Sequence, residues 1–239
     1  MGGFINLLKK TVEYILPKRC FSCAEFIQGE DGFCGSCWQK FNFITSPFCK
    51  TCGTEFELRT LEAYSNCLKC ISSPPAFDRA RAIFKFDENS KNIIHAFKYY
   101  DKTVLAKQFA KMLCERYANE MDDASIIVPV PMYRFKRLFR MYNPPQMIAN
   151  SISKRTGIEV IADLLSKVKW TKSQTKLSRK ERIANISASI QISGGERVKG
   201  KKVILVDDVI TTGTTINHCA KILKKAGAKE VLALSIAIV

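Results

Sequence analysis

Residues 203–215 read Val-Ile-Leu-Val-Asp-Asp-Val-Ile-Thr-Thr-Gly-Thr-Thr, and this stretch decides the fold. The four aliphatic residues at its start predict a short strand that is buried on both faces, as in a parallel sheet. Two adjacent acids, Asp207 and Asp208, come where that strand is expected to end. A turn rich in hydroxyl groups and glycine follows, and residues 216–226 then have the apolar spacing of a helix.

A strand, a polar turn and the start of a helix, in this order, predict an anion-binding site. The first backbone N–H groups of a helix have no partner within the helix, and the helix dipole favours negative charge there. The turn adds hydroxyl donors and a glycine that lets the backbone close around a phosphate, namely Thr211, Thr212, Gly213, Thr214 and Thr215. The acids suit sugar hydroxyls, or a Mg²⁺ ion that bridges them to a diphosphate. Phosphate, sugar and metal together indicate a phosphoribosyl ligand.

The same residues resemble the signature with which type I phosphoribosyltransferases bind phosphoribosyl pyrophosphate (PRPP). That signature is a hydrophobic strand, two acids, two further residues and then Thr-Thr-Gly-x-Thr, and residues 203–215 contain all of it. The alternative is a strand that ends in a solvated acidic turn before a threonine-capped helix. The resemblance implies that Asp207 and Asp208 are the acids of a catalytic site and hold the ribose hydroxyls. Residues 211–215 would then cradle the 5′-phosphate.

Eight of the ten cysteines form four Cys-x-x-Cys pairs, which are Cys20/Cys23, Cys34/Cys37, Cys49/Cys52 and Cys67/Cys70. Such a knuckle places two thiolates on one side of a tight turn, and two knuckles complete a tetrahedral Zn²⁺ site. Because no secretory signal is present, zinc is expected rather than disulfides. The four pairs predict two structural zinc sites without an open position for catalysis. Their spacing allows either sequential pairing of the knuckles or a crossed arrangement.

The 239-residue chain carries a formal net charge of +16, and this charge is unevenly placed. Residues 132–202 contain 17 Lys and Arg but only four Asp and Glu. This concentration favours a polyanion partner, either nucleic acid or a phosphorylated substrate, over a basic face that is merely solvated. No apolar run is long enough to cross a bilayer, and residues 1–16 read as an amphipathic helix rather than a signal peptide. The expected location is therefore the cytoplasm.

Three regions are expected, namely an N-terminal amphipathic helix (1–17), a double zinc ribbon (18–73) and a phosphoribosyltransferase-like domain (74–239). In the last of these, strands are expected at 81–87, 125–130, 158–162, 201–206 and 230–239, and helices at 89–99, 103–119 and 143–154. Alternating strands and helices predict an α/β domain with a mainly parallel sheet. Ligands of such sheets bind beyond the carboxyl ends of the strands, so the loop at 128–131 and the acidic pair are expected to face one ligand.

A second resemblance extends over nearly the whole chain. Residues 128–131 (Val-Pro-Val-Pro) with Arg137, Arg140, Asn143 and Gln146 resemble the ComF family, as do residues 171–185 and the segment from His95 to Tyr99. These are competence-associated proteins with a phosphoribosyltransferase-like domain behind a cysteine-rich zinc module. The resemblance implies that Val130 and Pro131 approach the pyrophosphate, and that Arg137 or Arg140 neutralises it. One departure is that residues 140–146 read Arg-Met-Tyr-Asn-Pro-Pro-Gln, where the family usually has Arg-Gly-Phe-Asn-Gln.

A basic segment beside Trp170 carries four further candidates, Lys176, Arg179, Lys180 and Arg182. Basic residues next to an aromatic ring can contact phosphates and stack on a base, which suits single-stranded DNA. The same segment can serve as a lid that excludes water from an active site, or simply as a solvated helix face.

Two functions from different classes are compatible with these features. The first is an enzyme that transfers phosphoribosyl from PRPP, with Mg²⁺, to an acceptor that the sequence does not identify. The second is a zinc-dependent nucleic-acid-binding protein of DNA uptake, in which the phosphoribosyl pocket serves as a sensor or a nucleotide grip. A purely structural zinc adaptor would leave the complete phosphoribosyl signature unexplained.

Overall fold

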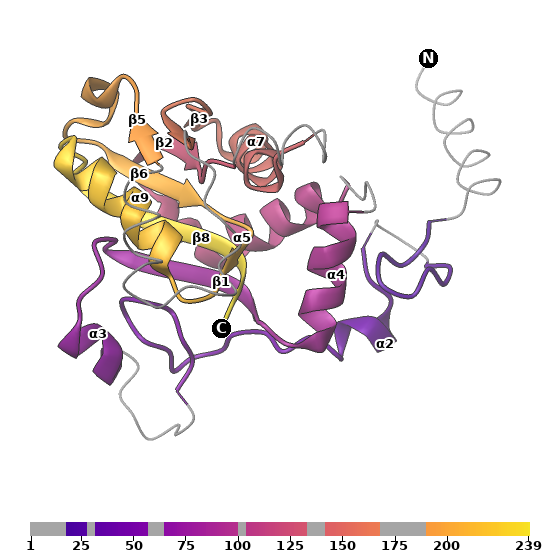
Figure 1. Ribbon diagram of the computed structural model, residues 1–239. Coiled ribbons are helices and arrows are strands. Elements are labelled where there is room, and N and C mark those ends of the chain that lie inside the picture. Colours follow the sequence, from indigo (N-terminus) through magenta and orange to yellow (C-terminus); the bar gives the residue numbers. More distant parts are fainter. Residues whose placement is uncertain (1–17, 28–31, 57–64, 100–103, 133–141, 168–189) are drawn as a thin grey trace, which may run out of the picture.

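The computed structural model describes residues 18–27, 32–56, 65–99, 104–132, 142–167 and 190–239 (Figure 1). The helix expected over residues 1–17 lies outside the described residues, as do Arg137, Arg140 and the basic segment around residues 176–182. Among the described residues, every helix is too short or too polar to span a bilayer.

The centre of the molecule is a parallel sheet with the strand order β1-β8-β6-β2-β3. Its strands are β1 (Arg79–Lys85), β2 (Ala124–Pro129), β3 (Glu159–Val160), β6 (Lys202–Val206) and β8 (Glu230–Ile238). The short strand β7 (Val209–Ile210) follows β6 and also pairs with β8 in parallel. A separate antiparallel pair consists of β4 (Leu165–Lys167) and β5 (Ile190–Ile192). The prediction of an α/β domain with a mainly parallel sheet is confirmed.

Helices cover both faces of this sheet (Figure 1). The longer ones are α4 (Glu88–Tyr99), α5 (Leu105–Met121), α7 (Pro144–Thr156) and α9 (Thr214–Lys225), and the short ones are α2 (Gly35–Trp38), α3 (Leu68–Ser72) and the 3₁₀ helix η2 (Gly195–Val198). Helices α4, α5 and α7 pack on one face with Ile204 and Val206 of β6. Helix α9 packs on the other face with Val203 and Leu205. The aliphatic run of β6 is thus explained, because a strand covered on both sides needs apolar residues throughout.

The strands and helices predicted between residues 81 and 239 all form, with ends displaced by at most two residues. The burial of β1, however, differs from the pattern in its sequence. Residues 81–87 alternate between polar and apolar, which is typical of a strand with one face in solvent. In the structure β1 is buried from Ala80 to Phe84, and even Arg81 is only 5% exposed. The guanidinium group of Arg81 contacts Glu120 at 2.5 Å and lies over the ring of Phe48, 5.1 Å from its centroid.

β1 is buried because the cysteine-rich segment lies along its free edge. The N–H of Ala80 donates to the carbonyl of Thr51 at 2.7 Å, and the N–H of Lys85 donates to that of Asn42 at 2.8 Å. Between them, the N–H of Ile44 donates to the carbonyl of Ile83 at 3.1 Å. An edge strand otherwise presents unpaired backbone groups, so this segment completes the hydrogen bonding of the sheet.

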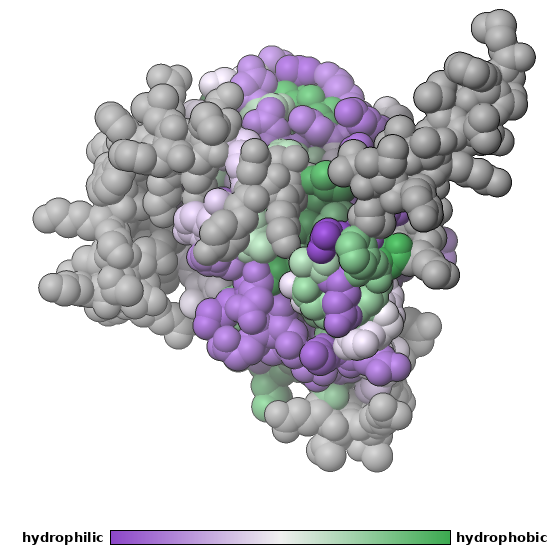
Figure 2. Space-filling view, turned by 90° about the vertical axis from the view of Figure 1, so that its right-hand side faces the viewer, coloured by the Kyte–Doolittle hydropathy of each residue, from purple (hydrophilic) through white to green (hydrophobic). Residues whose placement is uncertain are grey.

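Aromatic side chains join the first part of the cysteine-rich segment to the sheet. The ring of Phe84 on β1 lies 4.9 Å from that of Phe41 and 5.0 Å from that of Phe43. The ring of Phe33 lies a further 4.9 Å from Phe41. Figure 2 looks onto the side that carries α2 and α4, and it shows a mainly hydrophilic surface interrupted by a patch of apolar residues.

The departure from the family pattern near residue 142 is accommodated by the start of α7. Pro144 and Pro145 occupy the first two positions of this helix, where a missing N–H costs no hydrogen bond within the helix. The hydroxyl of Tyr142 donates to the carbonyl of Phe97 at 2.7 Å, which ties this turn to the end of α4.

Candidate functional site

The two acids lie directly after the end of β6, as the sequence predicts, and before the short strand β7. Val206 pairs with Leu234 of β8, and Val209 pairs with Ala237, so the register on β8 is unchanged across the acids. The N–H of Asp207 donates to the carbonyl of Leu234 at 2.9 Å, and the carbonyl of Asp208 accepts from Ile236 at 3.0 Å. Backbone hydrogen bonds to β8 therefore hold the acids in place between the two strands.

The two acids interact with residues of both flanking helices. Asp208 forms an ion pair with Lys98 of α4, with Nζ and Oδ1 2.8 Å apart. The charge of Lys98 also acts on Asp207. Burial raises the pKa of Cys219 on α9, and the charge of Asp207 raises it further, so Asp207 lies near this helix.

Burial and the neighbouring charge of Asp208 raise the pKa of Asp207 to about 8. Three interactions oppose this rise: the N–H of Asp208 donates to Oδ1 of Asp207 at 2.8 Å, and Lys98 and Lys167 lie near enough for their charges to act. Asp207 therefore holds a proton near neutral pH, and a cation bound beside it would favour its carboxylate form.

Lys98 is a site residue to which the sequence assigned no role. It stands in the segment from His95 to Tyr99 that resembles the ComF family, and this was the only signal that could have identified it. Its ion pair with Asp208 is a contact between α4 and the end of β6, about 110 residues apart in the sequence.

The turn after β7 has the form expected of a phosphate-binding loop. Gly213 caps α9 with a φ of +73°, a conformation that favours glycine. The hydroxyls of Thr212 and Thr214 lie 2.8 Å apart, and the N–H of Thr214 donates to the Thr212 hydroxyl at 3.4 Å. Thr211 and Thr212 are exposed, while Gly213, Thr214 and Thr215 are half-buried. Hydroxyls and the N-terminal N–H groups of α9 are therefore gathered at one accessible place.

The loop after β2 reaches the same edge of the sheet. The N–H of Val130 donates to the carbonyl of Val206 at 2.8 Å, directly before the acidic pair. The side chain of Val130 is buried, so this residue offers its backbone to the edge, and Pro131 beside it is half-buried. Both loops expected to face one ligand are thus neighbours in space.

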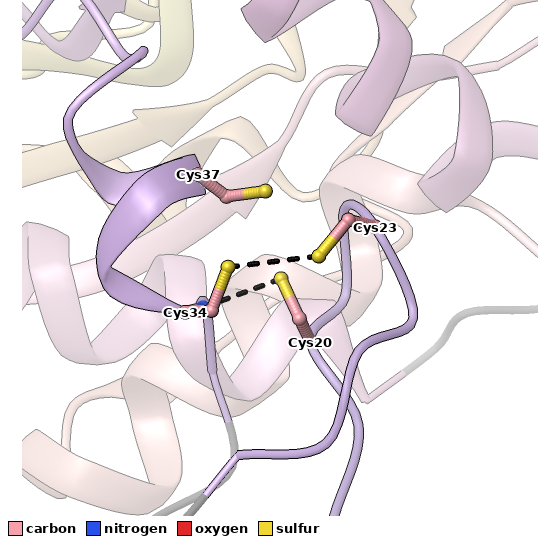
Figure 3. A group of neighbouring side chains, drawn as sticks. All are labelled: Cys20, Cys23, Cys34 and Cys37. Atoms are coloured by element: carbon pink, nitrogen blue, oxygen red, sulfur yellow. Dashed lines mark hydrogen bonds between the residues drawn. The ribbon is translucent and has the colours of Figure 1, made fainter.

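The first four cysteines gather into one group, drawn in Figure 3. Sγ of Cys23 lies 3.5 Å from Sγ of Cys34, and the N–H groups of Ser22 and Cys34 donate to Sγ of Cys20. Burial would raise the pKa of the Cys20 thiol, but these N–H donors bring it down to about 6.

The other four cysteines form an equivalent group. Sγ of Cys52 lies 3.7 Å from Sγ of Cys67, and the N–H groups of both residues donate to Sγ of Cys49. Against the effect of burial, these donors lower the pKa of Cys49 to about 7. One thiol in each group is thus prepared as a thiolate, the form that binds metals.

The geometry of both groups fits zinc. Within each, the ligand atoms all lie within 4.8 Å of one another. A tetrahedron with Zn–S bonds of about 2.3 Å has sulfur atoms about 3.8 Å apart, close to the shortest distances seen here. The groups are Cys20, Cys23, Cys34 and Cys37 on one side, and Cys49, Cys52, Cys67 and Cys70 on the other. Of the two arrangements that the spacing allowed, the structure has the sequential one.

Family models match both halves of the chain. A double zinc ribbon domain matches residues 11–71, and a phosphoribosyl transferase domain matches residues 147–237. Competence protein F of Haemophilus influenzae is 29% identical over 222 residues, which cover 89% of this chain and 93% of that protein. The chain is thus a homologue of ComF-type competence proteins over most of its length.

Two further ComF-like relatives show how the family is named elsewhere. Competence protein ComFC of Streptococcus pneumoniae is 29% identical over 202 residues, covering 80% of this chain and 87% of that protein. The DNA utilization protein YhgH of Escherichia coli K12 is 22% identical over 222 residues, which cover 90% of this chain and 95% of that protein. The ComF resemblance stated from the sequence is confirmed, and the double zinc ribbon together with the two thiol groups indicates two Cys₄ zinc sites.

Proposed function

We propose that this protein binds PRPP with Mg²⁺ at the edge of the sheet formed by Asp207, Asp208 and the loop 211–215. The observation that carries the proposal is the arrangement of these groups: a half-buried carboxylate pair is followed, after two residues, by the hydroxyl-rich turn that leads into the Gly213-capped start of α9. A sugar phosphate has this same order of groups, with hydroxyls on its ring and a 5′-phosphate beyond them.

Each part of the edge has a role in this proposal. The carboxylates accept hydrogen bonds from the ribose hydroxyls, and the N–H groups and hydroxyls of residues 211–215 bind the 5′-phosphate. The backbone at Val130 and Pro131 approaches the pyrophosphate. Arg137 and Arg140, which lie outside the described residues, would neutralise it, since a guanidinium group binds phosphate oxygens in pairs.

Mg²⁺ fits the donor set of this edge. It prefers carboxylate and phosphate oxygens and keeps several waters, so one or two carboxylates plus the diphosphate suffice to hold it. Asp207 and Asp208 are the described residues that would contribute, and the ion would supply charge neutralisation to the pyrophosphate. The eight cysteines of the two groups would hold structural zinc, with no role in the reaction.

Phosphoribosyl transfer is the reaction that such a site supports. The bond from ribose C1′ to the pyrophosphate oxygen breaks, pyrophosphate leaves with the electron pair, and an acceptor lone pair forms the new bond to C1′. Positive charges near the pyrophosphate stabilise the charge that develops on it. The acceptor remains to be identified.

Thermal unfolding of the zinc-loaded protein tests the binding. PRPP with Mg²⁺ at a hundred times its Kd should add about 2.7 kcal/mol of stability, which corresponds to roughly 5–10 °C in Tm for a chain of this size. Gly213→Val, which introduces a β-branched side chain at a positive φ, should lose this shift. An equal shift in the variant would refute the assignment of the phosphate to this loop.

A role in nucleic-acid handling is the second function we propose, supported by the net charge of +16 and by the similarity to the DNA utilization protein YhgH. The candidates are Lys176, Arg179, Lys180 and Arg182, with single-stranded DNA as the partner. If six or more phosphate contacts form, the affinity should fall about a thousandfold between 50 and 200 mM salt. A flat salt response would exclude this mode of binding.

A further inference from the structure

A cavity of about 590 Å³ lies between the second cysteine group and α9, and the loop 211–214 forms part of its wall. Its wall includes Cys52 and Cys70, the linker at 73–75, and the end of the chain at Ile238 and Val239. Figure 1 shows α3 and the end of the chain on the same side of the molecule as α9. A volume of 300–1,000 Å³ is typical of sites for small organic ligands. The cavity is thus large enough for a small organic ligand, and neither Asp207 nor Asp208 lines it.

The charged side chains that reach the cavity from its two helices are all lysines. Lys221 and Lys225 stand one turn apart on α9, and Lys69 lines the cavity from α3. No Asp or Glu is among the described residues that line the cavity, although the α-carboxylate of Val239 lies at its wall. None of these three lysines forms a salt bridge with a described residue, whereas the neighbouring Lys224 pairs with Asp78 at 2.7 Å outside the cavity. Three lysines around one cavity favour an anionic ligand.

The floor of the cavity is apolar and held in place. Phe77, Ile210 and Ile238 line it and are buried. The N–H of Ala76 donates to Oδ1 of Asn217 at 2.6 Å, which ties the linker after the cysteine-rich segment to α9. A ligand that contacts both the floor and the lysines needs an anionic end and an apolar, flat body.

We propose that this cavity is a second binding site, which takes a nucleoside 5′-monophosphate: the base on the apolar floor and the phosphate between Lys69, Lys221 and Lys225. The nucleotide can be free, or it can be the 5′-phosphorylated end of a strand. The proposal adjoins the PRPP site through Thr211–Thr214, but it stands on the lysines and the floor, so it does not depend on PRPP binding.

The competing explanation is that the lysines balance the zinc group. Four thiolates and one Zn²⁺ carry a net charge of about −2, and Cys52 and Cys70 line the same cavity. Under this explanation, neutralising the lysines changes zinc affinity, and the wild type binds no nucleotide.

Calorimetric titration of AMP into the zinc-loaded protein distinguishes nucleotide binding from charge balance of the zinc group. We expect saturable binding that weakens at least tenfold in Lys221→Ala/Lys225→Ala and is retained by Lys221→Arg/Lys225→Arg. The matched control is Lys107→Ala/Lys154→Ala, which removes the same charge from exposed positions on α5 and α7 and should bind AMP as the wild type does. Adenosine, which lacks the phosphate, should bind at least tenfold more weakly than AMP.

The outcomes that would overturn the proposal are distinct from failure of the PRPP site. Absence of AMP binding to the folded wild type overturns it. So does AMP binding that survives in Lys221→Ala/Lys225→Ala but is lost in Asp207→Asn/Asp208→Asn, because the nucleotide would then occupy the PRPP site. PRPP titrated into the lysine variant should bind normally. Titration with 5′-phosphorylated and 5′-hydroxyl oligothymidylates shows whether the cavity also binds the 5′-phosphate of a strand end. Tighter binding of the phosphorylated oligonucleotide than of AMP would make the strand end the preferred ligand.

Discussion

The ammonium group of Lys98 lies 2.8 Å from Oδ1 of Asp208, with side chains 21% and 16% exposed. This ion pair joins the last turn of α4 to the segment between β6 and β7. It places a fixed positive charge beside two adjacent carboxylates, which would otherwise repel each other in a partly buried environment.

Replacing Lys98 with Met should therefore destabilise the protein, because Asp208 is left without its counter-charge. We expect a loss of about 1–3 kcal/mol in the free energy of unfolding, below the value for a fully buried pair since both groups retain some contact with water. Urea unfolding at pH 7.5 measures it. Lys98→Met/Asp208→Asn should recover most of the loss, whereas additive effects of the two substitutions would show that the pair does not interact energetically.

The raised pKa of Asp207 makes stability depend on pH. Its folded-state pKa of about 8 lies above the ordinary 3.8, so the folded protein binds the extra proton between these values. The contribution of Asp207 to stability therefore falls as pH rises through this window, by at most about 1.4 kcal/mol per pH unit. Asp207→Asn removes the titration, so its stability relative to wild type should increase from pH 6 to 8.5. Parallel stability curves would contradict the shift.

Gly53 is a point at which the cysteine-rich segment meets the sheet without room for a side chain. Its φ is +74°, and a Cβ added there would lie 2.3 Å from the carbonyl oxygen of Ala80. Gly53→Ala should cost at least about 1–3 kcal/mol in the free energy of unfolding of the zinc-loaded protein. Gly35→Ala is the matched control: no atom lies within 4 Å of an added Cβ, and its cost should stay within about 0.5 kcal/mol. Equal costs would contradict the close approach.

Removal of zinc should expose the edge of β1 as well as unfold the ribbons. The N–H groups of Ala80 and Lys85 donate to carbonyls of the cysteine-rich segment, so chelation should greatly accelerate their hydrogen exchange. The amides of Val203 and Leu205 in β6 should remain protected, since their partners lie within the sheet. Protection at Ala80 and Lys85 that survives chelation would show that the edge is held without metal.

The elements and chemistry that the sequence predicts well are those that depend on contiguous residues. Local sequence determines the geometry of three features, so the spacing of their residues is enough to identify them. These are the aliphatic run at 203–206, the threonine-rich turn and the Cys-x-x-Cys knuckles. The short strand β7 after the acids was not predicted. Its two residues pair with the end of β8, about 30 residues further along the chain.

Contacts between distant segments account for the rest. The alternation at 81–87 is typical of a strand with one exposed face, but Asn42, Ile44 and Thr51 lie against β1, with partners about 30 to 40 residues away. Likewise, nothing local to Lys98 indicates that its partner is Asp208. The cavity beside Lys221 arises only when the second cysteine group packs near α9.

Calorimetric titration of PRPP with Mg²⁺ into the zinc-loaded protein measures whether the carboxylate pair and the adjacent loop bind PRPP. We predict saturable binding to the wild type, and its loss in Asp207→Asn/Asp208→Asn while the variant remains folded. Heats indistinguishable from dilution with a folded, zinc-replete wild type would contradict it, as would undiminished binding by the variant.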